Sequence, residues 1–261
     1  MPAHTQTEQI IELNKQDFVI LCPSRSRANI VSTRKFLSNL VLVVNADQKD
    51  EYRKYNPDCI ILSPPKEVSG ITPTRSWMIK TFKNIFMVDD DVIGVKRNYA
   101  ESGDEQYVTD PDEVYEIVAH SFYMARQLGA KLFTFDSGRH PLEYTSHVPY
   151  GFTGYFNNSH VGFLEGHGLK YNNSYGEAED YYISLLHAYQ NRYGLIDRRF
   201  TFVTKDNFIG DGGCCEYRTE DMMIENTLRL RKTFGEAVVL KSRAHTKTSV
   251  HKGERTIKIP F

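Results

Sequence analysis

The chain has 261 residues, of which 40% are hydrophobic and 25% are charged, and its formal net charge is −1 at pH 7. This composition is typical of a globular protein with a substantial core, and it excludes a mainly disordered or fibrous chain. No stretch approaches the roughly 20 apolar residues of a membrane span, and the first residues contain no signal-peptide core. We therefore expect a cytoplasmic protein that has no membrane partner.

The first half of the chain alternates apolar runs with amphipathic stretches, which indicates βα units and a largely parallel sheet. Residues 1–14 are expected to form a flexible N-terminus. The expected strands are Phe18–Cys22, Leu40–Asn45, Cys59–Leu62 and Ile85–Val88. The expected helices are Ala28–Leu37, Asp50–Tyr55 and Thr74–Phe82.

The second half of the chain is less regular. The expected helices are Asp112–Leu128, Glu179–Asn191 and Thr219–Phe234, and the expected strands are Lys131–Phe135, Phe200–Val203 and Val238–Leu240. Residues 151–173 are rich in glycine, asparagine and aromatic residues and are expected to mix strands with loops. No repeat or long linker divides the chain, so we expect one α/β domain over residues 15–261, with a mostly parallel central sheet flanked by helices.

Three consecutive carboxylates, Asp89, Asp90 and Asp91, follow the fourth expected strand. Side chains alternate along a strand, so Asp89 and Asp91 project to one face and Asp90 to the other. The triplet lies past the carboxyl end of the strand, where open α/β sheets bind ligands. A hard divalent cation, Mn²⁺ or Mg²⁺, would compensate the charges and bridge to a diphosphate. Asp89 and Asp91 are therefore candidate metal ligands, with an acidic strand exit on the surface as the alternative.

Two enzyme classes that bind a metal or a nucleotide sugar at a comparable position fit this chain poorly. Phosphatases of the haloacid dehalogenase type place Asp-x-Asp after a strand, but after the first strand of the domain, and here three expected strands come earlier. Sugar-nucleotide pyrophosphorylases need a glycine-rich phosphate loop after the first strand, and residues 23–27 contain no glycine.

The order of these elements resembles the GT-A glycosyltransferases over roughly residues 18–186, with a continuation to His251. In that family the loop after the first strand meets the nucleotide, and an acidic residue after the second strand contacts the base or ribose. A Gly-x-x-x-x-Arg stretch, here Gly70 to Arg75, reaches the phosphates or the sugar. The resemblance therefore implies donor-binding roles for Pro23, Ser24, Arg25, Arg27, Asp47 and Arg75, together with Asp90 of the triplet.

The resemblance also implies a metal shell and a catalytic carboxylate. Asp89 and Asp91 match the Asp-x-Asp motif, and a C-terminal histidine, here His251, completes the shell. Lys252 beside it is expected to contact a phosphate in a stretch that folds over the donor as a lid. Glu179 and Asp180 match the acidic pair at a helix start, where they act as a general base or bind the sugar, and Asp180 is preferred because it lies deeper in the first turn. Simple helix capping is the alternative for this pair.

More narrowly, the Pro-Ser-Arg-x-Arg-Ala loop, the Val-Asp-Asp-Asp strand end and the Gly-Glu-x-Glu-Asp helix start resemble phage DNA-base glycosyltransferases associated with TET/JBP hydroxylases. This resemblance implies a nucleotide-diphosphate sugar as donor, with UDP expected, and DNA containing hydroxylated pyrimidines such as 5-hydroxymethylcytosine as acceptor. It places a phage-encoded protein in the host cytoplasm. The donor-binding half is then about 15–110 and the acceptor-binding half about 111–261.

Residues 226–261 carry nine Lys or Arg and two Glu, a local net charge of +7. This region is expected to face an anionic ligand, with a solvated basic tail as the alternative. The aromatic cluster of Tyr150, Phe152, Tyr155 and Phe156 is the best candidate for an acceptor platform.

The sequence thus predicts a metal-dependent glycosyltransferase that modifies a hydroxyl group. A metal-dependent phosphatase and a glycosyltransferase acting on a glycan or another non-DNA acceptor are the alternatives. A non-enzymatic nucleic-acid binder would have no use for a carboxylate triplet that faces a polyanion.

Overall fold

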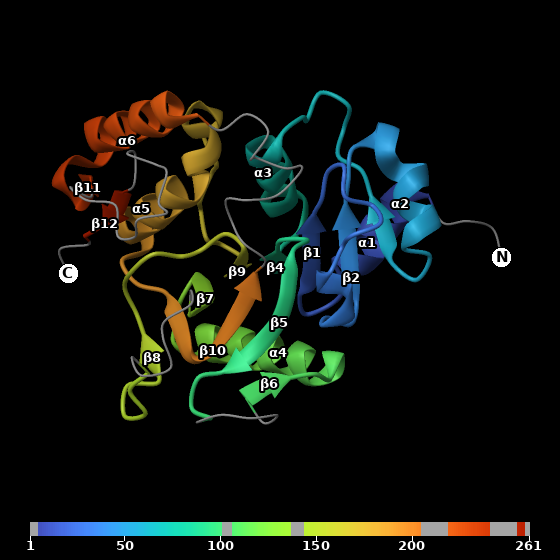
Figure 1. The fold of residues 1–261 in the computed structure, drawn as a ribbon, viewed down its shortest axis with the longest axis horizontal. Coiled ribbons are helices and arrows are strands. Elements are labelled where there is room, and N and C mark those ends of the chain that lie inside the picture. The colour runs from blue at the N-terminus through green and yellow to red at the C-terminus, as the bar shows by residue number, and fades with distance from the viewer. Residues whose placement is uncertain (1–4, 101–105, 137–143, 205–218, 241–254, 259–261) are drawn as a thin grey trace.

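The computed structural model describes residues 5–100, 106–136, 144–204, 219–240 and 255–258 (Figure 1). Its centre is a ten-stranded sheet of order β3-β2-β1-β4-β9-β7-β10-β5-β6, with β8 paired to β10. The strands are β1 (Val19–Pro23), β2 (Leu40–Val43), β3 (Ile60–Leu62), β4 (Ile85–Val88), β5 (Val92–Arg97), β6 (Tyr107–Val108), β7 (Leu132–Asp136), β8 (Tyr150–Gly151), β9 (His160–Phe163) and β10 (Leu195–Thr204).

The direction of the strands agrees with the expected sheet. Neighbours among β3, β2, β1 and β4 are all parallel, and β7, β10 and β6 run in the same direction as these strands. Only β9, β5 and β8 among the described strands of this sheet run in the opposite direction. The predicted fold class, an α/β domain with a mostly parallel central sheet flanked by helices, is confirmed.

Helices cover both faces of the sheet. They are α1 (Gln6–Leu13), α2 (Lys49–Tyr55), α3 (Ile71–Thr81), α4 (Pro111–Gln127), α5 (Glu179–Asn191) and α6 (Glu220–Phe234). On one face Phe122 of α4 stacks on Phe18, with ring centroids 4.5 Å apart. On the other face Met78 of α3 and Ile183 of α5 pack in a second core, which Leu13 of α1 joins.

The C-terminal part forms a smaller unit against α5. Strands β11 (Val238–Leu240) and β12 (Arg255–Ile257) pair antiparallel, and Figure 1 shows them beside α5 and α6. Leu230 of α6, Val238 of β11 and Leu185 of α5 share a third apolar cluster. None of the described helices is long and apolar enough to cross a membrane.

Two expected elements were wrong. Within the segment expected to be flexible, residues 6–13 form α1, because Thr5 and Glu8 make a capping box and the Gln6 amide bonds both backbone groups of Ser63. The expected helix at residues 28–37 is instead an irregular crossing with only a 3-10 turn, Thr33–Lys35. The Ser32 and Thr33 hydroxyls donate to backbone carbonyls of residues 89–91, here called the acidic turn, rather than capping a helix.

Candidate functional site

The acidic triplet occupies the carboxyl end of β4, in the middle of the sheet. Strand β1 flanks β4 on one side in parallel register, and β9 flanks it on the other side. The Asp89 N–H donates to the Ser159 carbonyl at 3.0 Å, which prolongs the β4–β9 pairing by one residue. Thr33 secures the turn by donating from Oγ1 to the Asp89 carbonyl at 2.5 Å and accepting from Val92 N at 3.1 Å. The backbone of the triplet is therefore held from both sides.

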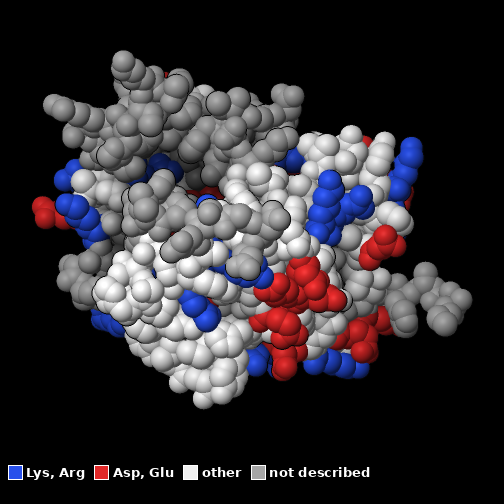
Figure 2. All heavy atoms as spheres, turned by 60° about the horizontal axis from the view of Figure 1, so that its bottom comes forward, with Lys and Arg blue, Asp and Glu red and all other residues white. Residues whose placement is uncertain are grey.

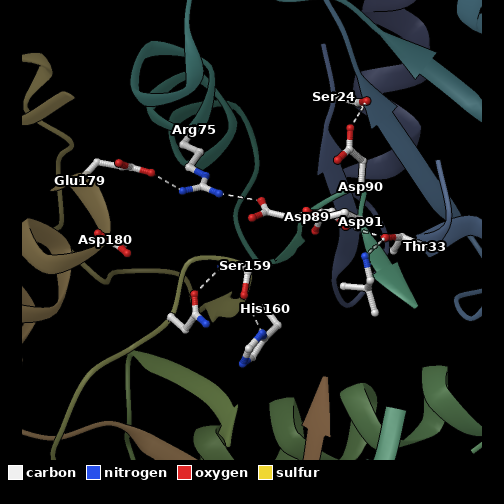
Figure 3. A network of polar contacts seen from close by, with 12 residues as sticks. Ser24, Thr33, Arg75, Asp89, Asp90, Asp91, Ser159, His160, Glu179 and Asp180 are labelled. Atoms are coloured by element: carbon white, nitrogen blue, oxygen red, sulfur yellow. Dashed lines mark hydrogen bonds and ion pairs between the residues drawn. The ribbon is translucent and has the colours of Figure 1, made fainter. Parts of the chain in front are cut away.

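Arg75 joins the first carboxylate of the triplet to helix α5 (Figure 3). Its guanidinium lies 2.6 Å from Asp89 Oδ1 and pairs with Glu179 Oε1 through its other terminal nitrogen. Gly70 begins α3 with a φ of +94°, a conformation that favours glycine, and so sets the direction of the helix that carries Arg75. Burial opposes the charge of this buried arginine, but Asp89 and Glu179 outweigh it and raise its pKa.

Asp90 points the other way and holds the loop after β1. Its carboxylate accepts from Ser24 Oγ and lies 2.9 Å from Arg27 Nη1. Tyr52 completes the network, because its hydroxyl lies 2.6 Å from Ser24 Oγ and accepts from Arg27 N at 3.1 Å. Burial raises the pKa of Asp90, while Ser24 and Arg27 oppose the rise.

Asp91 is the least compensated member of the triplet. Arg27 lies 3.6 Å from its Oδ2, and about a third of the side chain is exposed (30%). Burial, Asp89 and Asp90 raise its pKa to about 6. A cation beside Asp91 would relieve this repulsion.

The carboxylates fit a divalent cation only as an open site. Asp89 and Asp91 expose 31% and 30% of their side chains, so both offer accessible oxygen ligands. Within the described ranges no three His, Cys, Asp or Glu side chains converge as a metal site. Magnesium is commonly bound by one or two carboxylates together with substrate phosphates, and this donor set is compatible with that arrangement. A cation at Asp89 would share the Asp89 carboxylate with the Arg75 guanidinium or would displace that guanidinium.

Glu179 and Asp180 open helix α5 on the opposite side of Arg75 from the triplet (Figure 3). Glu179 is buried and paired with Arg75, and burial raises its pKa to about 7. Asp180 is half-buried and accepts a hydrogen bond from the Tyr155 hydroxyl. Burial also raises the pKa of Asp180. Neither residue caps its helix, because the N-cap position is Ala178.

The structure brings most of the residues picked from the sequence into one region. Ser24, Arg27 and Asp90 form one network, and Arg75, Asp89 and Glu179 form the other. Pro23 ends β1 beside the first network. Arg25 and Asp47 are exposed on the loops that follow β1 and β2. His251 and Lys252 lie outside the described residues.

The expected aromatic platform is divided between different environments. Phe156 is buried against His187, with ring centroids 4.9 Å apart, and Tyr150 lies under the Arg199 guanidinium. Phe152 is exposed, and Tyr155 bonds Asp180. These residues therefore do not form one stacking surface.

The sequence did not point to Thr33 or Tyr52, which hold the site, and it did not predict the role of Tyr155. Thr33 lay in the wrongly predicted helix, so no pattern pointed to it. Tyr52 sits in an expected helix, and an aromatic residue with a polar tip on the buried face was the available signal. Tyr155 was noticed as an aromatic residue, but its contact with Asp180 depends on chain folding over 25 positions.

Residues 18–213 match the family model described as TET-Associated Glycosyltransferase. The chain belongs to this family. No curated protein sequence matches it. The family match includes the β1 loop, Arg75, the acidic triplet and the Glu179–Asp180 pair, so both polar networks lie within the family domain.

Three solved structures are similar to this chain only at low sequence identity and low TM-score. The crystal structure of S. aureus TarS 1–349 aligns with this chain at 10% sequence identity and a TM-score of 0.43. The alignment covers 83% of this chain and 66% of the TarS chain. A mycobacterial protein is 12% identical over 62% of this chain and 58% of its own, with a TM-score of 0.34. The 4-diphosphocytidyl-2C-methyl-D-erythritol synthase of Anaerococcus prevotii is 9% identical over 85% of this chain and 99% of its own, with a TM-score of 0.37. The chain thus spans about two thirds of the TarS structure.

Proposed function

We propose that the chain transfers a sugar from a nucleoside-diphosphate sugar to a hydroxyl group on a pyrimidine base in DNA, with a divalent cation held by Asp89 and Asp91. The observation that carries this proposal is the position of these carboxylates at the carboxyl end of β4, beside the loop after β1. The chain's membership of a glycosyltransferase family supports sugar transfer as the reaction.

The donor is proposed to lie over the loops that follow β1 and β2. Asp90 holds Ser24 and Arg27 in place, so the Arg27 guanidinium is fixed beside Asp91 and can pair with a phosphate. The exposed Arg25 and Asp47 are proposed to contact the phosphates and the ribose or base. When bound, Mn²⁺ or Mg²⁺ would neutralise the diphosphate and the charge that develops on the departing nucleotide. Arg75 adds a fixed positive charge between the donor side and α5.

The acceptor hydroxyl is proposed to be activated by Asp180. In this step the acceptor oxygen loses its proton to Asp180 and bonds to the anomeric carbon of the sugar. The bond from that carbon to the diphosphate oxygen breaks, and its electron pair leaves with the nucleoside diphosphate. Asp180 is preferred to Glu179 because the Glu179 carboxylate is already paired with Arg75. This single displacement would invert the configuration at the anomeric carbon.

A hydroxylated pyrimidine in DNA is the proposed acceptor. A 5-substituent projects into the major groove, where it is accessible without base flipping. The phosphate backbone needs a positive surface, and the described part of the basic C-terminal region exposes Arg231 and Lys232 on α6. Figure 2 shows a group of acidic side chains on another part of the surface, which would repel a DNA backbone. We therefore propose that DNA approaches from the side of α6.

A thermal-shift panel tests the donor and metal assignments together. Nucleoside diphosphates and nucleotide sugars are added with and without Mn²⁺ to the wild type and to Asp91→Asn. A ligand at 100 times its dissociation constant stabilises the folded state by about 2.7 kcal/mol, so a specific donor raises the melting temperature. We expect this increase for the wild type with Mn²⁺ and its loss in the variant. Equal stabilisation of both proteins would contradict the proposed metal site.

A further inference from the structure

The carboxylate of Asp180 is held by a second segment of the chain as well as by its own helix. The Tyr155 hydroxyl donates to Asp180 Oδ2, and the Tyr181 N–H donates to Oδ1 at 2.7 Å. Tyr155 lies in the segment that leads into β9, whereas Asp180 lies in the first turn of α5. The two oxygens of one carboxylate are therefore fixed from two directions.

The position of Tyr155 is itself rigidly determined by its two neighbours in the chain. Gly154 has a φ of +146°, and a Cβ atom there would lie 3.2 Å from Ile196 Cδ1. Phe156 is buried, and its N–H donates to Ser184 Oγ at 3.0 Å. Ser184 Oγ also lies 2.9 Å from the Asp180 carbonyl. One buried serine thus ties the segment of Tyr155 to the first turn of α5.

Tyr155 also packs against α5, at a residue that the C-terminal unit contacts. Its ring packs against that of Tyr181, with centroids 4.9 Å apart and an interplanar angle of 37°. The Arg255 guanidinium of β12 covers the Tyr181 ring at 4.6 Å and also donates to the Met223 carbonyl of α6 at 3.2 Å. The Tyr155 ring is therefore packed against a residue of α5 that the C-terminal unit covers in turn.

We infer that Tyr155 is a positioning residue for Asp180: its phenol holds one carboxylate oxygen so that the carboxylate is aimed at the acceptor hydroxyl. This inference rests on the proposed function, in which Asp180 accepts the acceptor proton while the acceptor oxygen bonds to the sugar and the nucleoside diphosphate departs. Tyr155 itself gains and loses no proton in this step. Preorganised orientation of this kind accelerates a reaction because the catalytic group does not have to be reoriented.

The electrostatic surroundings make the contact measurable. Burial raises the pKa of Asp180, whereas the Tyr155 hydrogen bond, Arg255 of β12 and Arg75 of α3 act to lower it. Glu179 is the adjacent acidic group on α5. Replacing the phenol removes one contribution that favours the charged carboxylate, so the pKa of Asp180 rises further. The base form then exists only at higher pH.

The test compares Tyr155→Phe with Tyr181→Phe, which loses a neighbouring hydroxyl that donates to the Arg255 carbonyl and not to the carboxylate. We expect Tyr155→Phe to lower kcat for sugar transfer about 10- to 100-fold, as loss of a hydrogen bond to a charged group does. The acidic limb of its kcat/KM profile should move to higher pH, while the affinity for nucleoside diphosphate with Mn²⁺ stays unchanged. Tyr181→Phe should keep the wild-type pH profile.

A carboxyl-carbon NMR titration of the Asp180 side chain gives a readout that does not depend on turnover. A pKa that rises in Tyr155→Phe and not in Tyr181→Phe supports the inference. Identical Asp180 titrations in the wild type and Tyr155→Phe, or identical pH profiles of transfer, would overturn it. A wild-type protein that transfers no sugar would contradict the proposed function, and the titration would still decide whether Tyr155 governs Asp180.

Discussion

Asp91 carries a charge that, among the residues that the structure describes, is only partly compensated by Arg27. Burial and its two acidic neighbours raise its pKa from 3.8 to about 6, and Arg27 opposes the rise. For an acid whose pKa is raised on folding, the charged form destabilises the folded state. That loss of stability is complete above pH 6 and disappears as the pH falls toward 3.8.

Asp91→Asn should therefore be more stable than the wild type in chelated buffer at pH 7.5. The difference in the free energy of unfolding should shrink as the pH falls from about 6 toward 3.8, because the wild-type side chain takes up a proton. Urea unfolding of both proteins across this range provides the measurement. A difference that does not vary with pH would show that the raised pKa of Asp91 is not its cause.

The sequence identified the residues whose chemistry is local. Asp89, Asp90 and Asp91 follow an apolar strand, and that position alone predicted where they would lie. The contacts of these carboxylates involve residues far apart in the chain. Arg75, which pairs with Asp89, also pairs with Glu179, which is 104 positions away from it. No periodicity encodes such a pair, so Arg75 was predicted to contact the donor, whereas its bridge to Glu179 was not predicted.

Arg75 connects α3 to the end of β4 and to the start of α5. Its guanidinium pairs with Asp89 at the end of β4 and with Glu179 at the start of α5, and the side chains of Arg75 and Glu179 are buried. Arg75→Met should lower the free energy of unfolding by about 3–5 kcal/mol, because it leaves the buried Glu179 carboxylate and the partly buried Asp89 carboxylate uncompensated. The loss should be smaller at pH 5 than at pH 8, since burial raises the pKa of Glu179 and its carboxylate loses charge as the pH falls.

Arg53→Met is the matched control for this measurement. Arg53 pairs with Asp50 on α2, but the two side chains are largely exposed, so its removal should cost less than about 1 kcal/mol. Urea unfolding of the two variants at both pH values would decide the question. Equal losses for the buried and the exposed arginine would refute the bridging role.

Strand β9 supports the acidic turn only because one of its residues has no side chain. A Cβ atom on Gly162 would lie 1.9 Å from Cε1 of Phe133 on the neighbouring β7. Gly162→Ala should destabilise the fold by about 1–3 kcal/mol or more, as overpacking of a core does. Gly94→Ala on β5 is the control, because its Cβ would meet Tyr107 at an ordinary 3.7 Å and should change stability by less than about 1 kcal/mol. Thermal unfolding of both variants provides the measurement. A Gly162→Ala variant with the stability of the wild type would be inconsistent with this packing.

The elements that could be predicted are those with a strong repeating pattern. Strand β4 and helix α5 have the predicted bounds, because an apolar run and a helical periodicity define them. Strands β5, β6, β8 and β12 were missed, since they are short or interrupted by glycine and depend on their neighbours for pairing. The wrong helix at residues 28–37 includes Val31 and Thr33, whose β-branched side chains disfavour helix.

The positive charge of the molecule is concentrated toward the C-terminus, where residues 226–261 have a net charge of +7. If DNA lies along α6, transfer to DNA should weaken as salt rises, because binding releases counterions from the phosphates. Replacing Arg229, Arg231 and Lys232 together by Gln should flatten the slope of log affinity against log salt by up to about 3. Nucleoside-diphosphate affinity serves as the control and should not change. An unaltered salt slope would remove α6 from the DNA contact.

The most direct measurement is the transfer of labelled sugar from nucleotide sugars to DNA with and without 5-hydroxymethylated pyrimidines, in the presence of Mn²⁺. The proposed function predicts that label joins the hydroxylated DNA alone, that one nucleotide sugar is preferred, and that Asp91→Asn and Asp180→Asn abolish the transfer while remaining folded. Release of phosphate from simple phosphomonoesters, with no transfer of label to any hydroxyl acceptor, would contradict it. Transfer to a glycan and none to hydroxylated DNA would contradict the DNA acceptor.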